Sequence, residues 1–341
     1  MRKIQEAKNL ENKAVFVRCD FNVPMGKNGE ILDDTRIVKT IPLIEYLLKK
    51  GAKVILASHL DDPGGKFKKE LSLEPLQDRL FEYLDVSVWK APDCIGAKVK
   101  KAIDSLKGGE VILLENLRFH PGEEENDLRF AKKLASLAQI YVNEAFGVSH
   151  RAHASIATLP KLLPSFAGFL LQEEVKVLSQ ILQNPKRPLV LVLGGKKAET
   201  KIPVIQNFLP KADFILVGGK LVKEGIPFSD KKLILAKLVK SGYDVSKESV
   251  LTFQKIIKKA KTIVWNGPMG FFEEKKYFEG TEAIARAIAG AQAFKVAGGG
   301  ETLEVVKKLK LESKFDFLST GGGAMLEFLA GKKLPGIEAL K

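Results

Sequence analysis

Four apolar runs in the second half of the sequence each end in a cluster of glycines. The runs are LVLVLGG, FILVGG, FKVAGGG and FLSTGGG, with glycines at 194–195, 218–219, 298–300 and 321–323. A strand that ends in glycines and leads into a helix presents bare backbone N–H groups and the positive end of the helix at one point. Phosphate groups bind at such points. The second half therefore predicts a nucleotide-binding region.

The first half carries a different set of polar residues. It holds all four histidines of the chain, which are His59, His120, His150 and His153. Only nine of the 55 basic residues are arginines, so Arg36, Arg118 and Arg151 stand out among the many lysines. The guanidinium group makes paired hydrogen bonds to carboxylate and phosphate oxygens. We expect a second anionic ligand in this half.

Short apolar runs alternate with helical segments and must position these residues. Strands are expected at 13–21, 52–60, 110–117 and 138–146, and helices include 36–50 and 126–137. This alternation predicts a parallel sheet with helices on both faces. Ligands collect at the carboxyl ends of such strands. The side chains that follow those ends are Asp20, Asn22, His59, Arg118, His150 and Arg151.

The pattern repeats after an interruption at Pro160 and Pro164. Segment 170–183 has the apolar spacing of one long helix, and a second set of strands follows it. These strands are expected at 189–193, 213–217, 232–236, 262–266, 293–297 and 315–318. One hydrophobic core stops growing at about 250–300 residues, so 341 residues predict two domains, divided near 165–185. The predicted class is α/β, with two Rossmann-like domains joined by a hinge helix, each a parallel sheet with helices on both faces.

Composition limits the function classes. The net charge of +14 comes from scattered lysines without a long basic run, which favours a solvated surface over a nucleic-acid partner. No run approaches the roughly 20 apolar residues of a membrane span, and the first residues lack the apolar core of a signal peptide. Cys19 and Cys94 are too few for a disulfide framework or a thiolate metal site, which indicates a reducing compartment. We expect a cytoplasmic protein.

Single motifs leave alternatives open. GGKKAETKI places Lys197 and Lys201 on one face of the following helix, where they either face solvent or bind phosphate. It is not a P-loop, and no glycine cluster is a clean GxGxxG. The run TIVWNGPMGFFE at 262–273 could be a buried turn under a core tryptophan, and SHRAHAS at 149–155 could be a satisfied polar loop or an anion site.

Taken together, the motifs resemble the phosphoglycerate kinase family. The matching segments occur in family order along nearly the whole chain. They are VRCDFNVP, DDTRI, ASHL, LLENLRFHPGEEEND, YVNEAFGVSHRAHAS, GGKKAETKI, WNGPMGFFE, GGGETL and STGGGAMLEFLAGKKLPGIEAL.

The resemblance implies a two-lobed kinase that moves a phosphoryl group between 1,3-bisphosphoglycerate and ADP, or between ATP and 3-phosphoglycerate. The substrate domain would be 1–170, with 325–341 returning to it, and the nucleotide domain would be 171–324. Mg²⁺ would accompany ATP or ADP, and the protein would be a monomer. Closure of the lobes about 165–185 would exclude water from the acyl phosphate.

The resemblance also implies roles for individual residues. Arg36 and Lys197 would be the catalytic cations, which stabilise the phosphoryl group in flight. The 3-phosphoglycerate site would comprise Asp20, Phe21, Asn22, Arg36, His59, Leu60, Asp61, Asp62, Arg118 and Arg151. The nucleotide site would comprise Gly195, Lys197, Lys201, Asn266, Glu273, Gly299, Gly300, Glu301 and Thr302. Glu273 would hold the ribose hydroxyls, and Glu301 would be the magnesium ligand.

Three features depart from the family pattern. SHLDDP stands where the family usually has SHLGRP, so Asp61 and Asp62 replace a glycine and an arginine, and a lysine such as Lys66 could supply the lost charge. GGGET stands for GGGDT, which makes the magnesium ligand a glutamate, still a hard oxygen donor. The stretch 219–244 is shorter than the family norm by roughly 50 residues, which leaves the base-binding wall least certain.

Two other interpretations remain. A catalytically silent relative that binds nucleotide or phosphoglycerate would fit Asp62 and the shortened stretch, although Arg36, Lys197, Lys201 and Glu273 together argue for activity. A nicotinamide dehydrogenase would need a GxGxxG turn followed by an acidic residue, and neither is present in the required context.

Overall fold

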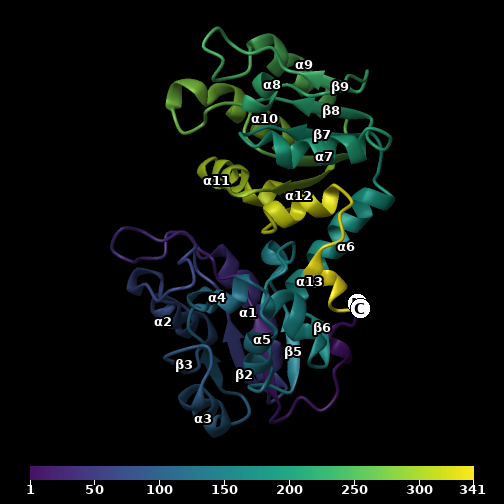
Figure 1. Ribbon diagram of the computed structural model, residues 1–341. Coiled ribbons are helices and arrows are strands. Elements are labelled where there is room, and N and C mark those ends of the chain that lie inside the picture. The colour runs from purple at the N-terminus through teal and green to yellow at the C-terminus, as the bar shows by residue number, and fades with distance from the viewer. The chain divides into compact units, whose positions relative to one another are not determined.

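The computed structural model describes residues 1–341 and divides them into two compact units. The first comprises Met1–Glu173 with Lys333–Lys341, and the second comprises Glu174–Lys332. The chain passes from one to the other within helix α6, Phe169–Gln183, close to the predicted 170–183 (Figure 1). The return to the first unit begins at Lys333, whereas the sequence had suggested a return from 325. The reason is that α12, Gly323–Leu329, packs on α7, Ala198–Phe208, where Asn207 Nδ2 donates to the Leu329 carbonyl.

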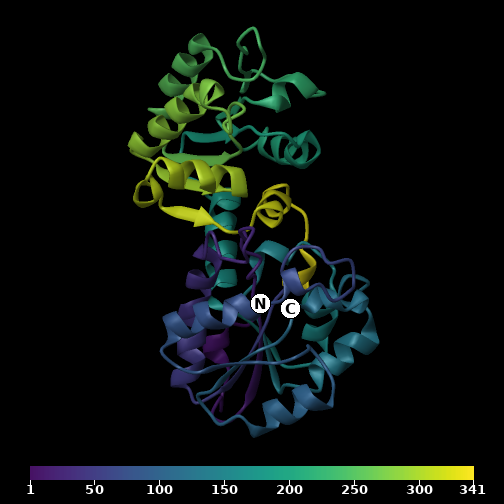
Figure 2. The ribbon, with the colours of Figure 1, turned by 90° about the vertical axis from the view of Figure 1, so that its left-hand side faces the viewer.

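The first unit is built on six parallel strands in the order β3-β4-β2-β1-β5-β6. The strands are β1 Ala14–Arg18, β2 Lys53–Ala57, β3 Val88–Lys90, β4 Val111–Leu113, β5 Ile140–Asn143 and β6 Ser165–Ala167. Helices lie on both faces of the sheet (Figure 2). They are α1 Thr35–Lys49, α2 Glu74–Leu84, α3 Ala97–Ser105, α4 Pro121–Glu124, α5 Leu128–Ala135 and α13 Pro335–Glu338. Short 3₁₀ and π turns η1 to η6 connect these elements, including η3 Leu117–Phe119 and the π turn η5 Ala154–Thr158.

The second unit repeats the architecture with six parallel strands in the order β12-β11-β10-β7-β8-β9. The strands are β7 Leu189–Leu193, β8 Phe214–Val217, β9 Leu233–Leu235, β10 Thr262–Asn266, β11 Phe294–Gly298 and β12 Phe317–Ser319. The remaining helices are α8 Lys220–Glu224, α9 Lys247–Ile257, α10 Glu279–Gly290 and α11 Gly300–Lys308. The α/β class with two parallel sheets is therefore confirmed.

Apolar runs become central strands because both of their faces are covered. All five residues of β7, with the sequence LVLVL, are buried, as are all five of β10. Continuous burial is the mark of a parallel sheet between two helix layers. Side-chain caps set some helix starts: Asp127 accepts from Phe130 N at the start of α5, and Ser246 accepts from Ser249 N at the start of α9.

Strands β3 and β6 were missed by the sequence analysis. Each has only three residues and lies at an edge of the first sheet. In β3, with the sequence VWK, Trp89 is exposed and Val88 alone is buried, so the run is too short to stand out as a buried strand. The expected strands 13–21, 52–60, 110–117 and 138–146 are confirmed but end earlier, because their last residues form the loops that carry polar side chains.

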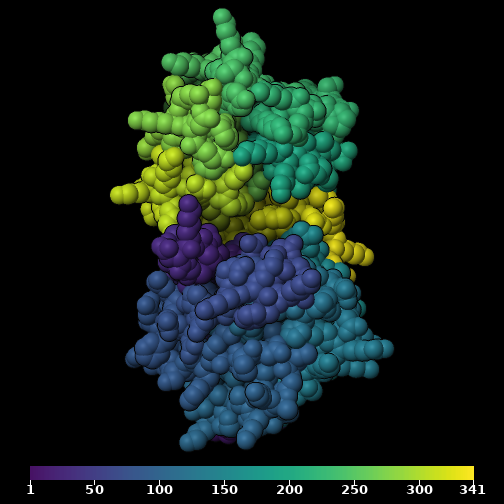
Figure 3. All heavy atoms as spheres, turned by 60° about the vertical axis from the view of Figure 1, so that its left-hand side comes forward, coloured from purple at the N-terminus to yellow at the C-terminus, as the bar shows by residue number.

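Each sheet reverses its strand order at one point. In the first unit the switch lies between β1 and β5, and in the second between β7 and β10. Loops diverge at such a point and leave a crevice at the carboxyl ends of the strands. The loop after β1, purple in the space-filling view, projects from the surface of the first unit (Figure 3).

The shortened stretch 219–244 holds little regular structure. It contains α8, which has five residues, and the three-residue strand β9. A bridge between Leu238 and Val245 closes the loop that follows β9. Along the whole chain, no helix combines the length and the apolar character that a membrane crossing requires.

Buried glutamates hold both parts of α6. In the first unit, Glu144 Oε1 accepts from Leu170 N at 3.0 Å, and Glu144 Oε2 has no partner. In the second unit, Glu174 accepts from Ser319 Oγ at 2.7 Å and from Thr320 N at 2.8 Å. Burial raises the pKa of Glu144 to about 8, although backbone donors at the start of α6 oppose the shift. Glu144 is thus a neutral acid at pH 7.

We predict that Glu144 makes the protein less stable as the pH rises. In the unfolded chain this carboxyl ionises near its ordinary value of 4.5, whereas the folded protein keeps its proton up to about 8. Between these values the folded state binds the extra proton, so each added pH unit lowers the free energy of unfolding by about 1.4 kcal/mol. Denaturant unfolding of the wild type and of Glu144→Gln, from pH 5 to pH 9, measures the difference. Equal pH dependence of the two proteins would contradict the prediction.

Candidate functional site

Arg36 and Asp20 form an ion pair at the carboxyl edge of the first sheet. Arg36 lies in the first turn of α1, and its Nη1 is 2.5 Å from Asp20 Oδ2. Asp20 is nearly buried, whereas about a third of the Arg36 side chain is exposed. The pair brings together the predicted catalytic cation and a predicted substrate-binding carboxylate. The guanidinium keeps an exposed edge that can meet an anion.

Hydrogen bonds tie the loops after β1, β2 and β4 to one another. Phe21 N donates to Ser58 Oγ, and Asp61 N donates to Asn22 Oδ1 at 2.9 Å. Arg118 Nη1 donates to the Asp61 carbonyl at 2.8 Å. The structure therefore brings together these predicted site residues, with Leu60 buried among them.

The two aspartates that depart from the family pattern are both exposed. Asp61 has a φ of 52°, a left-handed conformation that favours glycine and that aspartate tolerates better than most residues. A glycine in the family pattern therefore fits this backbone. Asp62 Oδ1 accepts from Gly64 N at 3.3 Å, and Arg151 and Lys66 are also exposed. No interaction of the structure links Lys66 to this group.

A buried arginine that the sequence analysis missed lies beneath these loops. Arg18, the last residue of β1, is fully buried, and its Nε donates to Ser155 Oγ at 2.7 Å. Arg18 Nη1 donates to the Cys19 carbonyl, and Arg18 Nη2 lies 3.7 Å from Glu123 Oε1. Glu123 in turn accepts from the backbone N and the hydroxyl of Ser155. An arginine inside an apolar run, as in VFVRCDF, is the signal that could have identified it.

Two histidines near this edge, His59 and His153, are neutral. Arg18 Nη2 lies 3.3 Å from His59 Nδ1, and burial followed by Arg18 lowers the pKa of His59 well below its ordinary value. Burial, with Arg118 next, lowers the pKa of His153 to about 3. The positive charge at the carboxyl edge therefore belongs to the arginines, while His59 offers a neutral ring nitrogen.

In the second unit, the turns after β7 and β10 pack backbone to backbone. Gly194 N donates to the Asn266 carbonyl and Gly195 N to the Pro268 carbonyl, both at 2.9 Å. Gly267 has a φ of 95°, and a Cβ placed on it would lie 2.2 Å from the Gly194 carbonyl oxygen. Only glycine fits this approach, which accounts for the Asn-Gly-Pro turn under the buried Trp265.

The turn after β11 completes the same edge. Asn266 Nδ2 donates to the Gly298 carbonyl at 2.7 Å, and Gly267 N donates to Thr302 Oγ1 at 2.7 Å. Gly299 precedes α11, which starts at Gly300, so free backbone donors of the helix N-terminus lie beside the turn. The predicted residues Asn266, Gly299, Gly300 and Thr302 thus form one group.

Lys201 and Glu301 border a small space over Gly195. A Cβ on Gly195 would lie 3.3 Å from Glu301 Oε2 and 3.6 Å from Lys201 Nζ. Lys201 is buried, which rules out the interpretation of a solvent-facing pair, and burial lowers its pKa against the effect of Glu301. Lys197 occupies the N-cap position of α7 without a side-chain cap hydrogen bond, and it is exposed, so it can meet a ligand from the solvent side.

Lys196 was also missed by the sequence analysis. Its Nζ lies 2.8 Å from Glu273 Oε1, 4.0 Å from Glu301 Oε1 and 5.2 Å from the centre of the Phe271 ring. Lys196 therefore holds the carboxylate that was predicted to bind the ribose. It stands between Gly195 and Lys197 in the same motif, and its type gave no signal separate from that of Lys197.

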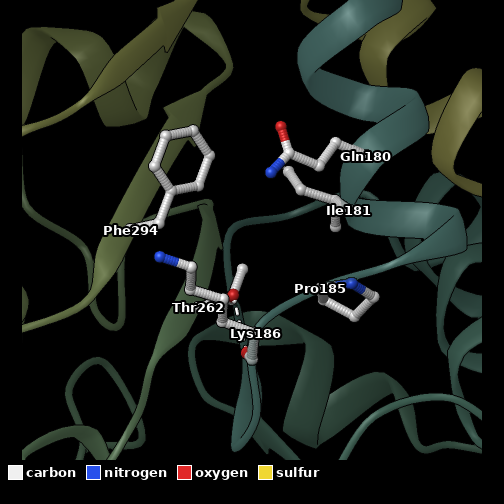
Figure 4. A pocket seen from close by; sticks show the side chains of 6 residues that line it. All are labelled: Gln180, Ile181, Pro185, Lys186, Thr262 and Phe294. Carbon is white, nitrogen blue, oxygen red and sulfur yellow. Dashed lines mark hydrogen bonds between the residues drawn. The ribbon is translucent and has the colours of Figure 1, made fainter.

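A pocket elsewhere in the second unit does not belong to this site. Figure 4 shows its lining by Gln180, Ile181, Pro185, Lys186, Thr262 and Phe294. Thr262 and Phe294 are the first residues of β10 and β11, so the pocket lies at the amino ends of the strands, opposite the glycine turns.

Comparison with known proteins decides the family. The sequence model described as "Phosphoglycerate kinase" matches residues 4–233 and 228–332. The chain belongs to the phosphoglycerate kinase family. It is 42% identical to the phosphoglycerate kinase of Coprothermobacter proteolyticus over 388 aligned positions, which cover 100% of this chain and 98% of that protein. It is 43% identical to that of Moorella thermoacetica, covering 97% of each.

Solved phosphoglycerate kinase structures share the fold. The structure from Coxiella burnetii is 35% identical, with a TM-score of 0.82, over 99% of this chain and 98% of that one. The structure from Pyrococcus horikoshii OT3 is 30% identical, with a TM-score of 0.86, over 100% of this chain and 98% of that one. The family's kinase activity, an ATP-dependent transfer to a carboxyl group, is thereby the function of this chain.

The comparisons also locate what the chain lacks. The alignment spans 388 positions for a chain of 341 residues, so the relative carries residues that are absent here. The two matched segments of the family meet at 228–233, inside the stretch 219–244. The chain is therefore a shortened member, and the missing part falls between β8 and α9.

We predict that Gly267→Ala disrupts the nucleotide side of the second unit. The methyl group would overlap the Gly194 carbonyl, and the left-handed backbone would cost an additional ~1–2 kcal/mol. We expect a lower midpoint of thermal unfolding and weaker ATP binding by calorimetry. Gly290→Ala is the matched control, because nothing lies within 4 Å of its added Cβ. Similar behaviour of the two variants would show that the close approach is not a constraint.

Proposed function

We propose that the first unit binds 3-phosphoglycerate or 1,3-bisphosphoglycerate and that the second binds the magnesium complex of ATP or ADP. The observation that supports this most directly is the group of glycine turns and the α11 N-terminus around Gly195, Gly267 and Gly299. Backbone donors and helix dipoles at such a point stabilise phosphate charge. The arginine-rich edge of the first unit suits a smaller anion with a carboxylate and a phosphate.

On the substrate side, Arg36, Arg118 and Arg151 supply charge, and neutral His59 supplies a hydrogen bond. Asp20 and Asn22 would contact the glycerate hydroxyl and carboxylate region, with Phe21, Leu60 and Asp61 shaping the loop. Asp20 orients Arg36 through their ion pair before any ligand arrives. A side chain whose rotamer is already fixed loses less entropy when the anion binds.

On the nucleotide side, Lys197 and Lys201 would neutralise the phosphates. Gly195, Asn266, Gly299, Gly300 and Thr302 would present the backbone and side chains that line them. Glu273 would accept hydrogen bonds from the ribose hydroxyls, which requires it to share or to give up its contact with Lys196. Lys196 would then be available to a phosphate.

The residues present fit a magnesium ion. Glu301 is a hard oxygen donor, partly exposed, and it borders the space over Gly195. We propose that Glu301 holds Mg²⁺ together with the nucleotide phosphates. When bound, the ion neutralises phosphate charge and favours departure of the phosphoryl group.

The proposed reaction is an in-line transfer between a carboxylate oxygen and the terminal phosphate of the nucleotide. In the direction of ATP synthesis, a β-phosphate oxygen of ADP attacks the acyl phosphorus, and the bond to the glycerate carboxylate oxygen breaks. No proton transfer is required at the carboxylate, so positioning and charge neutralisation supply the catalysis. Arg36 and Lys197 would stabilise the group in flight. Closure about α6 would exclude water.

We further propose that the protein is cytoplasmic, as its composition suggests, and that it is a monomer. Cys19 and Cys94 are buried free thiols, as a reducing compartment allows. Light scattering of the purified protein tests the monomeric state.

We predict that Arg36→Ala lowers kcat by roughly 100- to 1,000-fold, the effect typical of removing one donor to a transition-state charge. The coupled assay of ATP-dependent phosphorylation of 3-phosphoglycerate measures it. Arg286→Ala, which removes an exposed arginine paired with Glu282 on α10, is the control and should keep full activity. Thermal unfolding of each variant separates a folding defect from a catalytic one. An unchanged kcat in folded Arg36→Ala would remove Arg36 from the mechanism.

Membership of the phosphoglycerate kinase family over the whole chain argues against the silent-relative alternative, which rested on Asp62 and on the shortened stretch 219–244. The same assay on the wild type measures the expected turnover.

We predict that Asp62→Arg lowers the KM for 3-phosphoglycerate several-fold. Asp62 interacts electrostatically with Arg118, so its negative charge weakens the attraction of this edge for an anion. Asp62→Asn removes the charge without adding a cation and should give a smaller decrease. If neither variant changes the KM, Asp62 does not face the ligand.

A further inference from the structure

A group of three different metal-binding side chains lies at the edge of the first sheet. Asp93 and Cys94 follow β3, and His120 follows η3 beyond β4. One ligand atom from each residue lies within 4.8 Å of the other two. In a tetrahedral site with bonds of about 2.0–2.3 Å, ligand atoms are roughly 3.5 Å apart. Small side-chain movements would close the group around an ion.

The surrounding contacts orient these ligands before any ion binds. His120 Nε2 lies 2.6 Å from Asp93 Oδ1, and the His120 ring stacks on Phe130 with centroids 5.1 Å apart. Cys94 Sγ donates to the Glu115 carbonyl at 2.9 Å, and Cys94 N donates to Asp93 Oδ1. The Phe130 contact fixes the plane of the His120 ring, whereas an ion would replace the His120–Asp93 contact and the bond from Cys94 Sγ.

The local charge favours a cation. Burial, followed by the negative neighbours Asp93, Glu115 and Glu123, raises the pKa of the Cys94 thiol, and Lys90 opposes them. Lys90 is already paired with Glu115 Oε2 at 2.7 Å. One thiolate and one carboxylate balance the two charges of a divalent ion. Partial exposure of Asp93 and His120 leaves room for water as a fourth ligand.

We propose that Asp93, Cys94 and His120 form a Zn²⁺ site, with the Cys94 proton released to solvent on binding. A thiolate, an imidazole and a carboxylate are the donors that Zn²⁺ prefers, and Mg²⁺ and Ca²⁺ select oxygen alone. The sequence argued against a thiolate site because two cysteines are too few, but here histidine and aspartate supply the other ligands. The site is separate from the proposed magnesium ligand Glu301, which belongs to the other unit.

Metal occupancy would also fix the segment that carries Arg118. Arg118 lies in η3, two residues before His120, and Asn116 caps this turn by accepting from Arg118 N. An ion on His120 would therefore restrain a residue of the proposed phosphoglycerate site. This second consequence rests on the proposed function, whereas binding of Zn²⁺ does not.

The test uses the full-length protein, ZnCl₂ and CoCl₂ in excess Mg²⁺. We expect one equivalent of Zn²⁺ by competition with a chromophoric chelator, and a thiolate-to-cobalt charge-transfer band with Co²⁺. Cys94→Ser should abolish the band, and His120→Gln should weaken Zn²⁺ binding by roughly tenfold or more. Cys19→Ser, which removes the other buried thiol, is the matched control and should keep both signals.

Several outcomes would overturn the site. They are no Zn²⁺ binding in the presence of Mg²⁺, a cobalt band that survives Cys94→Ser, or unchanged affinity in His120→Gln. If Cys94→Ser fails to fold, Asp93→Asn replaces it as the test variant, because Asp93 is partly exposed. Unchanged Zn²⁺ affinity in Asp93→Asn would also contradict the proposal. None of these readouts depends on kinase activity, so failure here leaves the proposed function intact.

Discussion

Parallel pairing of strands is the constraint on which both candidate sites depend. In each unit all six strands point the same way, so every loop that follows a strand emerges at one edge of the sheet. Residues far apart in sequence, such as Asn22 and Asp61, or Gly194 and Asn266, meet there through hydrogen bonds. The two edges differ in chemistry: side-chain guanidinium groups dominate the first, and backbone amides dominate the second. This difference in chemistry supports the proposal that each unit binds a different anion.

Burial sets the charge of the titratable groups around these edges. His59 and His153 are neutral because they are desolvated beside arginines, and Glu144 keeps its proton because it is buried under the start of α6. Burial lowers the pKa of Lys201, and the nearby charge of Glu301 opposes this shift. Charge at the candidate sites thus resides on a few side chains with exposed edges, chiefly Arg36 and Lys197, and these groups face the solvent from which ligands arrive.

The sequence predicted the parts of the molecule that local pattern controls. Long buried runs such as LVLVL and the helix at 170–183 were identified because their periodicity is strong. The three-residue edge strands β3 and β6 were not, since tertiary pairing alone makes them strands. Among site residues, glycine turns and arginines could be found by type. Arg18 could have been noticed as a charge inside an apolar run, but its partners, like those of Lys196, are brought to it only by folding.

The fully buried Arg18 restricts how this lineage can change over time. Its guanidinium depends on Ser155 and Glu123 from distant segments, and those two also bind each other. Replacing one member alone would leave a buried charge or donor without a partner, which lowers the free energy of unfolding by several kcal/mol. Successive single substitutions at these positions would be purged by selection, so descendants must either retain the trio or exchange it in concert. The sequence positions of Arg18, Ser155 and Glu123 should accordingly change more slowly than those of the exposed arginines above them.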